Sequence, residues 1–264
     1  MATTVFFHAH PDDEAIQTGG TMAKMAAAGH RVVLVTATRG ELGEVPEGLL
    51  APGESLAERR AQELAAACAA LGVARHEYLG YGDSGMADEP TNDDPGCFWR
   101  ADTEEAAGRL EAILVEEGAD VLVTYDENGG YGHPDHIQVH RVGIRGAARA
   151  GTPHVFMATV NRDYLLALTE KSEDFGLDLP DEQRATLEHL GVRAERITTT
   201  VDVSAFLDHK RRAMQAHASQ IGETSFFLSM PPEAFAAVWG NEWYIRVGPA
   251  PATAVDDALL PPGR

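Results

Sequence analysis

The chain has 264 residues, of which 44% are hydrophobic and 23% charged, a composition that is typical of a globular protein and argues against global disorder. Its 41 acidic and 21 basic residues give a formal net charge of −20. A surface this acidic repels nucleic-acid phosphates and anionic lipid headgroups, so we expect neither nucleic acid nor a membrane as a partner.

The sequence predicts a reduced, cytoplasmic protein. No apolar run reaches the 18 residues of a membrane span, and the N-terminal segment lacks the basic region of a signal peptide. The two cysteines, Cys68 and Cys97, are too few for a disulfide framework and lack the spacing of metal ligands. Cys68 lies in the alanine-rich run LAAACAALG, where we expect a small buried side chain.

Short β-branched or aromatic runs alternate with longer helical stretches in the first 160 residues, a pattern typical of a parallel α/β sheet. In chain order we predict strands at TTVFF (3–7), RVVLVTAT (31–38), DVLVTY (120–125) and HVFMATV (154–160), and helices over 15–28, 55–71, 104–117 and 136–150. The helix over 55–71 has clear ends, because Ser55 can cap it, Glu58 completes a capping box and Gly72 stops it.

The second half is less regular. We predict a surface loop over 172–184, a strand at ITTTVDV (197–203), a basic helix over 205–219 and a last strand at EWYIRVG (242–248). The residues from 249 to 264 are rich in proline and alanine and predict a flexible tail. Residues 1–248 are therefore interpreted as one domain, with a mostly parallel sheet covered by helices on both faces.

Two junctions in this pattern look alike. HAHPDDE follows the first predicted strand, and DENGGYGHPDH follows the strand at 120–125. In doubly wound sheets, ligands bind beyond the carboxyl ends of the strands, where such loops lie. Each junction has His-Pro directly before a predicted helix, which places His10 and His133 at or near helix caps. The first helical turns are then expected to hold Asp12 and Asp13, and Asp135 and His136.

Six ionisable groups at neighbouring strand ends would repel one another and lose hydration unless a cation compensates them. His10, Asp13 and His136 provide two imidazoles and one carboxylate, the stoichiometry of a catalytic zinc site with open positions. Asp12 is then a spare carboxylate that can take a proton from water, and His133 is the general acid or the electrostatic partner of an oxyanion.

The segments AHPDDE and GYGHPDHIQVHR resemble the PIG-L/LmbE-like family of zinc-dependent N-acetylglucosaminyl deacetylases over roughly the first 150 residues. The branch that looks nearest is the actinobacterial deacetylase of mycothiol biosynthesis. The resemblance implies a Rossmann-like fold and one zinc ion per chain, with His10, Asp13 and His136 as ligands. It also implies hydrolysis of an N-acetylated amino sugar, an N-acetylglucosamine conjugate, to acetate and a free amine.

The same resemblance implies further site residues. Asp12 would be the general base and His133 its partner acid, Asp135 would hold and tune His133, and Tyr131 would assist at the oxyanion. Three more positions would contact the sugar or the group attached to it. They are Glu44 in the segment GEV, Arg60 in RAQEL and Asp83 in DSGM.

Other interpretations stay open at this point. The amidases of mycothiol-type conjugates carry a lysine where this chain has Gln17. His8, His10 and Asp12 imitate the start of the dinuclear metallo-β-lactamase-like motif, although that motif has a histidine where this chain has Asp13. Two histidines and a carboxylate also describe non-haem iron oxygenases, although those usually draw these ligands from a β-barrel, and ferrous iron is an alternative cofactor. A non-catalytic sugar-binding module, a homo-oligomer and a place for His217 near the cleft are further hypotheses.

Overall fold

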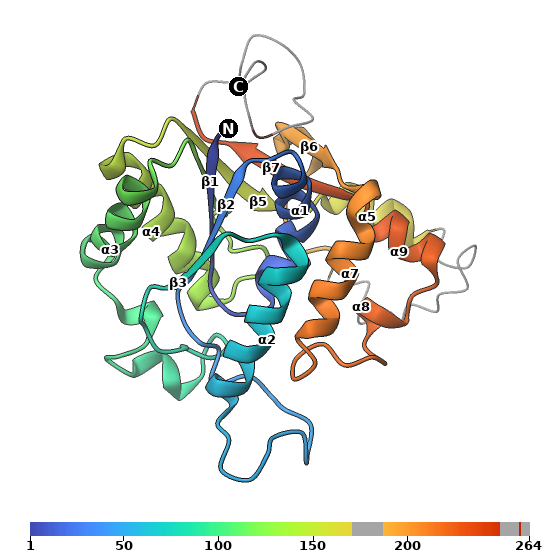
Figure 1. The fold of residues 1–264 in the computed structure, drawn as a ribbon, viewed down its shortest axis with the longest axis horizontal. Coiled ribbons are helices and arrows are strands. Elements are labelled where there is room, and N and C mark those ends of the chain that lie inside the picture. The colour runs from blue at the N-terminus through green and yellow to red at the C-terminus, as the bar shows by residue number, and fades with distance from the viewer. Residues whose placement is uncertain (171–186, 249–258, 260–264) are drawn as a thin grey trace.

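The chain forms one mixed sheet with helices on both faces, as the sequence pattern predicts (Figure 1). The computed structural model describes residues 1–170, 187–248 and 259. The strand order is β3-β2-β1-β4-β5-β7-β6; β7 pairs antiparallel with β5 and with β6, and the other neighbours are parallel. The strands are β1 (Thr3–His8), β2 (Arg31–Thr36), β3 (Arg75–Tyr78), β4 (Val121–Tyr125), β5 (His154–Thr159), β6 (Thr199–Asp202) and β7 (Asn241–Arg246).

Helices cover the sheet in two groups. In Figure 1, α3 and α4 lie together on one side, and α1, α2 and α7 lie on the other. The helices are α1 (Gly19–Ala27), α2 (Leu56–Leu71), α3 (Thr103–Glu117), α4 (Pro134–Ala150), α5 (Arg162–Thr169), α7 (Leu207–Ala216), α8 (Phe226–Ser229) and α9 (Pro232–Trp239). No helix within 1–170, 187–248 and 259 is long and apolar enough to cross a membrane.

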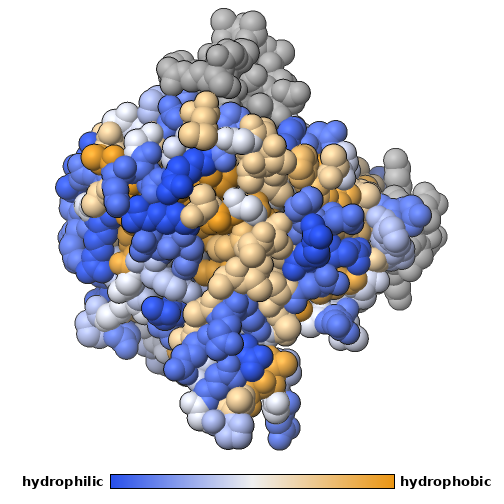
Figure 2. Space-filling view, viewed as in Figure 1, coloured by the Kyte–Doolittle hydropathy of each residue, from blue (hydrophilic) through white to orange (hydrophobic). Residues whose placement is uncertain are grey.

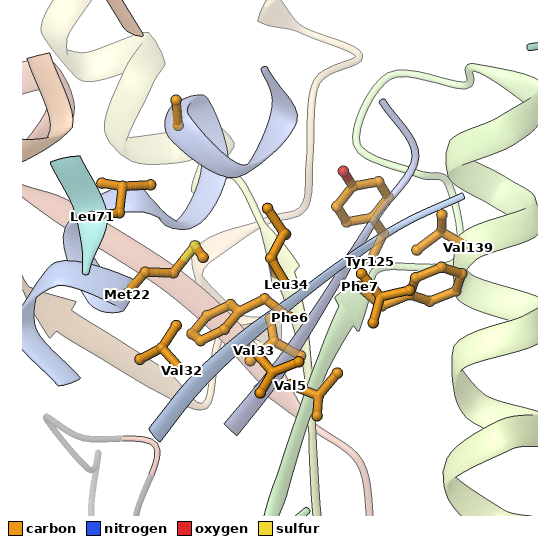
Figure 3. Packing of buried hydrophobic residues seen from close by; sticks show 14 of the residues in the cluster. Val5, Phe6, Phe7, Met22, Val32, Val33, Leu34, Leu71, Tyr125 and Val139 are labelled. Atoms are coloured by element: carbon orange, nitrogen blue, oxygen red, sulfur yellow. The ribbon is translucent and has the colours of Figure 1, made fainter. Parts of the chain in front are cut away.

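The core lies on both faces of the central strands. Side chains alternate between the faces along a strand, so neighbouring residues of β1 pack against different helices. Figure 3 shows Phe7 beside Val139 of α4, whereas Phe6 lies toward Met22 of α1 and Leu71 of α2. Because both faces are covered, β1 and β2 are buried almost throughout, and each contains an unbroken apolar run, VFF and VVLV, which made it recognisable in the sequence.

One face of the molecule carries a mildly apolar band between hydrophilic flanks (Figure 2). The flanks lie over α3 and α7, and the band follows α1 and α2, where Ala65, Ala66 and Ala69 are exposed. The opposite side of α2 is buried and includes Cys68, as expected, and its thiol pKa is raised to about 12 by burial. Cys97 is also a buried free cysteine.

Several predicted boundaries change in the structure. The ends of α2 are confirmed, with the capping box of Ser55 and Glu58 and a left-handed Gly72. The helix expected over 15–28 begins instead with a π-helical turn, Glu14–Thr18, and the helix expected over 205–219 starts with a 3₁₀ turn and ends at Ala216. The sequence pattern missed β3, α5 and α9.

The predicted loop over 172–184 lies outside the described residues. So does the predicted tail over 249–264, except for Leu259, which is buried against the core. The strand order reverses between β1 and β4, since the chain proceeds outward from β1 in one direction and from β4 in the other. Such a reversal opens a crevice at the carboxyl ends of the two strands, and both His-Pro segments follow these ends.

Candidate active site

The two junctions fold differently. His133 is the N-cap of α4 and Pro134 is its first residue, as the sequence predicts. At the first junction the prediction of a helix directly after His-Pro is wrong. The helical turn there begins only at Glu14, and Asp12 has a φ of 119°, far from helical values.

Side-chain acceptors explain the irregular first junction. The backbone N–H of His10 donates to Asp13 Oδ2 (2.9 Å), and that of Asp12 donates to Glu14 Oε2 (2.9 Å). These bonds satisfy the two N–H groups in a loop, so the chain turns before the helix starts. Asp12 and Asp13 therefore diverge because the backbone turns at Asp12, and not because they are successive residues of one helix as we expected.

The proposed metal ligands meet at one carboxylate oxygen. Asp13 Oδ2 lies 3.3 Å from His136 Nε2 and 3.5 Å from His10 Nδ1. On the other side of each ring, His136 Nδ1 lies 3.1 Å from the Gly129 carbonyl and His10 Nε2 lies 3.0 Å from Asp135 Oδ2. When these nitrogens donate to those acceptors, the remaining nitrogens offer lone pairs toward Asp13.

This donor set fits a cation. His136 Nε2 is buried, has no hydrogen-bond partner among the described residues and lies 3.3 Å from Asp13 Oδ2, so a cation between the two atoms would satisfy both. Donors bound tetrahedrally at 2.0–2.2 Å are about 3.3–3.6 Å apart, which is the spacing of both contacts to Asp13. Burial disfavours a charge on His10, yet Asp13, Asp135 and Asp83 raise its pKa well above the usual value, so its surroundings favour positive charge.

Two further donor sets overlap this one. In the described part of the chain, His10, His133 and His136 lie close enough together to hold an ion, as do His10, Asp83 and Asp135. All of these residues are buried except for part of Asp83. His10 belongs to both sets, so the whole cluster is built around one imidazole and could hold a metal ion.

The adjacent carboxylates differ in their electrostatics. Burial raises the pKa of Asp12 to about 6, although the Arg60 guanidinium, 3.1 Å away, opposes this shift. Burial acts in the same direction on Asp13, but His136 and His10 outweigh it and hold the pKa of Asp13 well below its usual range. Environments that move apart the pKa values of two neighbouring acids are typical of an acid–base site.

His133 is held as a neutral imidazole. Burial and the neighbouring His10 and His136 lower its pKa to about 4. Its Nδ1 accepts the backbone N–H of Asp135 (3.1 Å), which leaves the proton of the neutral ring on Nε2. Asp135 contacts His133 through this backbone group, whereas its carboxylate, which we expected to hold and tune His133, is bonded elsewhere.

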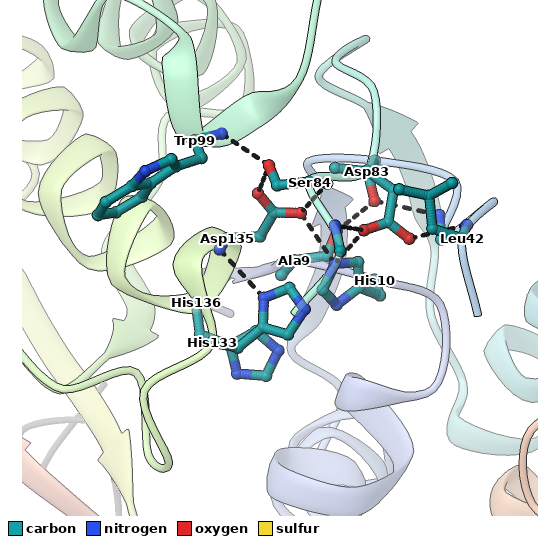
Figure 4. Close-up of polar contacts among 12 residues, drawn as sticks. Ala9, His10, Leu42, Asp83, Ser84, Trp99, His133, Asp135 and His136 are labelled. Carbon is teal, nitrogen blue, oxygen red and sulfur yellow. Dashed lines mark hydrogen bonds and ion pairs between the residues drawn. The ribbon is translucent and has the colours of Figure 1, made fainter. Parts of the chain in front are cut away.

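The Asp135 carboxylate instead connects His10 with Ser84 (Figure 4). Ser84 donates to it from both its backbone N–H (3.0 Å) and its hydroxyl, and the Ser84 hydroxyl accepts the N–H of Trp99 (2.9 Å). Ser84 is fully buried. Ser84 was not predicted as a site residue, because its place beside Asp83 in DSGM was the only signal in the sequence.

Tyr131 lies at the mouth of the site and is 52% exposed. Its ring centroid is 4.9 Å from that of His136 and 6.1 Å from that of His133. The loop before it approaches α4 closely, since a Cβ on Gly129 would collide with His136 and lie 2.8 Å from the N of Ile137. Gly129 also has a φ of 59°, so both the conformation and the close approach favour glycine there.

The expected sugar contacts lie at different depths. Arg60 is only 4% exposed; its guanidinium donates to the Gly40 carbonyl (2.8 Å) and the Pro11 carbonyl and pairs with Asp12. Asp83 Oδ1 is 3.5 Å from His10 Nε2. The side chain of Glu44 is exposed on the loop after β2, and its carbonyl accepts from the side chain of Gln220 (3.0 Å).

His217 does not line the cleft but lies beneath it. It is fully buried, and its Nε2 lies 2.6 Å from Glu14 Oε1. His8 is buried as well, between the hydroxyls of Tyr125 (2.7 Å) and Thr18 (2.8 Å). The sequence left the place of His217 open, and Glu14 was not predicted as a site residue.

A buried His/Asp group that could hold a metal ion, at the switch point of a Rossmann-like sheet, is the type of site that metal-dependent enzymes have. The chain belongs to the PIG-L family, because residues 5–147 match the model of that family, which is described as GlcNAc-PI de-N-acetylase. A relative from Catenulispora acidiphila is 44% identical over 90% of this chain and 81% of its own length. One from Thermomonospora curvata is 42% identical over 97% and 95%. Both are named 1D-myo-inositol 2-acetamido-2-deoxy-alpha-D-glucopyranoside deacetylase, the first with the suffix 1.

A solved structure with a similar fold is named for a different reaction, a hydration. The 4-carboxy-2-hydroxymuconate hydratase GalB of Pseudomonas putida matches with a TM-score of 0.60 and 18% identity, over 97% of this chain and all of the other. At this identity the likeness concerns the fold alone. The fold therefore does not determine the activity of this chain, which depends on the residues of the site.

Proposed function

We propose that this protein is a metal-dependent hydrolase that removes the acetyl group from an N-acetylglucosamine conjugate and releases acetate and a free amine. One observation carries the proposal: His10 Nδ1 and His136 Nε2 lie within 3.5 Å of the same Asp13 oxygen, while the carboxylate of the adjacent Asp12 pairs with Arg60 outside this set and has a pKa of about 6. A metal site and a separate base are the two requirements of metal-assisted amide hydrolysis. The two relatives that are more than 40% identical to this chain are both named as deacetylases of an acetamido sugar, which supports the same activity.

The cofactor in this proposal is one zinc ion per chain, held by His10, Asp13 and His136. When bound, such an ion polarises the acetamide carbonyl and makes water more acidic. Two imidazoles and one carboxylate also suit ferrous iron, so the test compares both metals.

The remaining steps belong to side chains of this chain. Asp12 takes a proton from the water whose oxygen attacks the acetyl carbon, and gives that proton to the nitrogen as the C–N bond breaks. His133 donates a hydrogen bond from Nε2 to the oxygen of the former carbonyl, where negative charge develops. The Tyr131 hydroxyl assists at the same oxygen.

Substrate recognition is assigned to three residues around the His/Asp group, Asp83, Arg60 and Glu44. Asp83 lies nearest to His10 and would accept hydrogen bonds from sugar hydroxyls. Arg60 and Glu44 lie farther along, on α2 and on the exposed loop after β2. Because Arg60 is already bonded to Asp12, it would connect sugar binding with the placement of the base.

The experiment is a panel of N-acetylated amino sugars, including the glucosaminyl inositol named for the relatives, with released primary amine as the readout. Enzyme stripped of metal and reloaded with zinc, or with ferrous iron under anaerobic conditions, is compared with untreated enzyme. We expect amine release that is lost with the metal and restored by it. Full activity in the stripped enzyme, or no release from any member of the panel, would contradict the proposal.

A further inference from the structure

Asp12 has a backbone conformation that its own side chain does not favour. Among the described residues, only Asp12 and Asp88 are non-glycine residues with a positive φ. Such a conformation persists only where surrounding contacts hold it. Two side chains from outside the residue support this conformation: Arg60 pairs with the Asp12 carboxylate (3.1 Å) and donates to the carbonyl of Pro11, while Glu14 accepts the Asp12 backbone N–H.

Glu14 is placed to fix this backbone group. Its Oε2 accepts the Asp12 N–H at 2.9 Å, and its Oε1 lies 2.6 Å from His217 Nε2. Both side chains of the Glu14–His217 pair are fully buried. The carboxylate therefore has one oxygen for each partner, and a shift of Glu14 in either direction breaks one of the two bonds.

His217 is in turn fixed by the turn 217–221. The N–H groups of Gln220 (3.0 Å) and Ile221 (2.7 Å) donate to the carbonyl of His217. Ser219 ties the turn to α2, since its N–H (2.9 Å) and its hydroxyl (2.6 Å) both donate to Glu63. These hydrogen bonds fix the position of the His217 imidazole, although His217 lies more than 200 residues from Asp12 in the sequence.

We propose that Glu14, held by His217, is a positioning residue that keeps the Asp12 carboxylate aimed at the reacting water. It acts through its bond to the Asp12 backbone, so its length matters and its charge does not. The inference rests on the proposed function, in which Asp12 is the general base. A base must stay within hydrogen-bond reach of its proton, and a displacement of about 1 Å can cost about 100-fold in rate.

Two variants of Glu14 separate the effect of side-chain length from the effect of side-chain charge. Glu14→Gln keeps the length and an oxygen for the Asp12 N–H, and can donate from its amide to a neutral His217. Glu14→Asp keeps the charge but is one methylene too short to reach both partners. The matched control is Glu242→Asp, the same shortening at a buried carboxylate that accepts hydrogen bonds from Gly20, Thr21 and Lys210 and has no described bond to Asp12, Glu14 or His217.

The measurements are kcat, KM, bound metal per chain and the hydrogen-exchange rate of the Asp12 amide. We expect Glu14→Gln and Glu242→Asp to keep kcat within about threefold. Glu14→Asp should lose about 10–100-fold in kcat, with KM and metal content unchanged and the Asp12 amide exchanging faster. Wild-type kcat in Glu14→Asp, or an equal loss in Glu14→Gln, would overturn the inference.

A failure of the proposed function looks different. If the wild-type enzyme releases no amine from acetamido sugars, the proposed function fails. The amide exchange still decides the inference, because it requires no turnover. An Asp12 amide that exchanges equally fast in the wild type and in Glu14→Asp would show that Glu14 does not hold this backbone group.

Discussion

The two His-Pro-Asp segments contain the same three residues in the same order, yet they build different structures. At the second, His133 caps α4, Pro134 opens the helix and Asp135 lies in its first turn. At the first, the chain turns at Asp12 with a φ of 119° before the helical turn begins. The second segment follows a local rule, whereas the first is shaped by Arg60 and Glu14 and supplies both a metal ligand and the base.

The sharpest test of this contrast lies within the second junction. His136→Ala should weaken metal binding by more than about 100-fold, because removing a ligand costs more than disturbing its support. Activity should be lost with the metal. His133→Ala is the matched control: it should keep the metal and lose about 10²–10³ in kcat, as expected for one oxyanion donor. Metal analysis after dialysis checks both, and a fully loaded His136→Ala would exclude this residue as a ligand.

A substitution in the loop that contains Gly129 and Gly130 should have a smaller effect on metal binding. Gly129→Ala pushes a Cβ into His136 and moves the carbonyl that orients its ring, so metal affinity should fall about 10–100-fold. Gly130→Ala is the control for backbone strain alone, since Gly130 also has a positive φ, 77°, but a Cβ there meets nothing within 4 Å. Competition with a chelator measures both affinities. Equal affinities in the two variants would mean that the contact with His136 is unimportant.

The smallest expected effect concerns pH and the first junction. Arg60 opposes the burial that raises the pKa of Asp12 to about 6, and activity requires the ionised carboxylate. The rate should therefore fall as the pH drops through about 6. In Arg60→Gln this acidic limb should move to higher pH by about one unit or more. We also expect KM to rise about tenfold from the loss of a charged hydrogen bond.

The control for this prediction is Arg60→Lys, which keeps a charge near Asp12. Its acidic limb should stay close to that of the wild type, while its KM rises because an ammonium group lacks the planar fork. The dependence of kcat/KM on pH provides the measurement. An acidic limb that does not move in Arg60→Gln would show that Arg60 leaves the base unaffected.

Much of the fold was predictable because local patterns determine it. Unbroken apolar runs marked β1, β2 and β4, and Ser55, Glu58 and Gly72 marked the ends of α2. The second junction was predictable for the same reason, since proline at the first helical position is a local signal. β3 was missed because RHEY is an edge strand of half-buried residues without an apolar run.

The remainder depends on contacts between distant residues. The conformation of Asp12 follows from Glu14 and Arg60, and Glu14 is itself held by His217, 203 positions along the chain. The role of Ser84 likewise appears only when Asp135 is brought beside it. Composition and spacing contain no record of such pairs, so the sequence indicated which residues are present at the site but not how they support one another.

The central claim is that the neighbours Asp12 and Asp13 have different roles, one as base and one as metal ligand. Bound metal and kcat measured together in Asp12→Asn and Asp13→Asn test it most directly. We predict that Asp12→Asn keeps its metal and its KM while kcat falls by about 10²–10⁴, the contribution of a general base. Asp13→Asn should lose metal and regain part of its activity in excess zinc. Metal lost from Asp12→Asn and retained in Asp13→Asn would contradict the account.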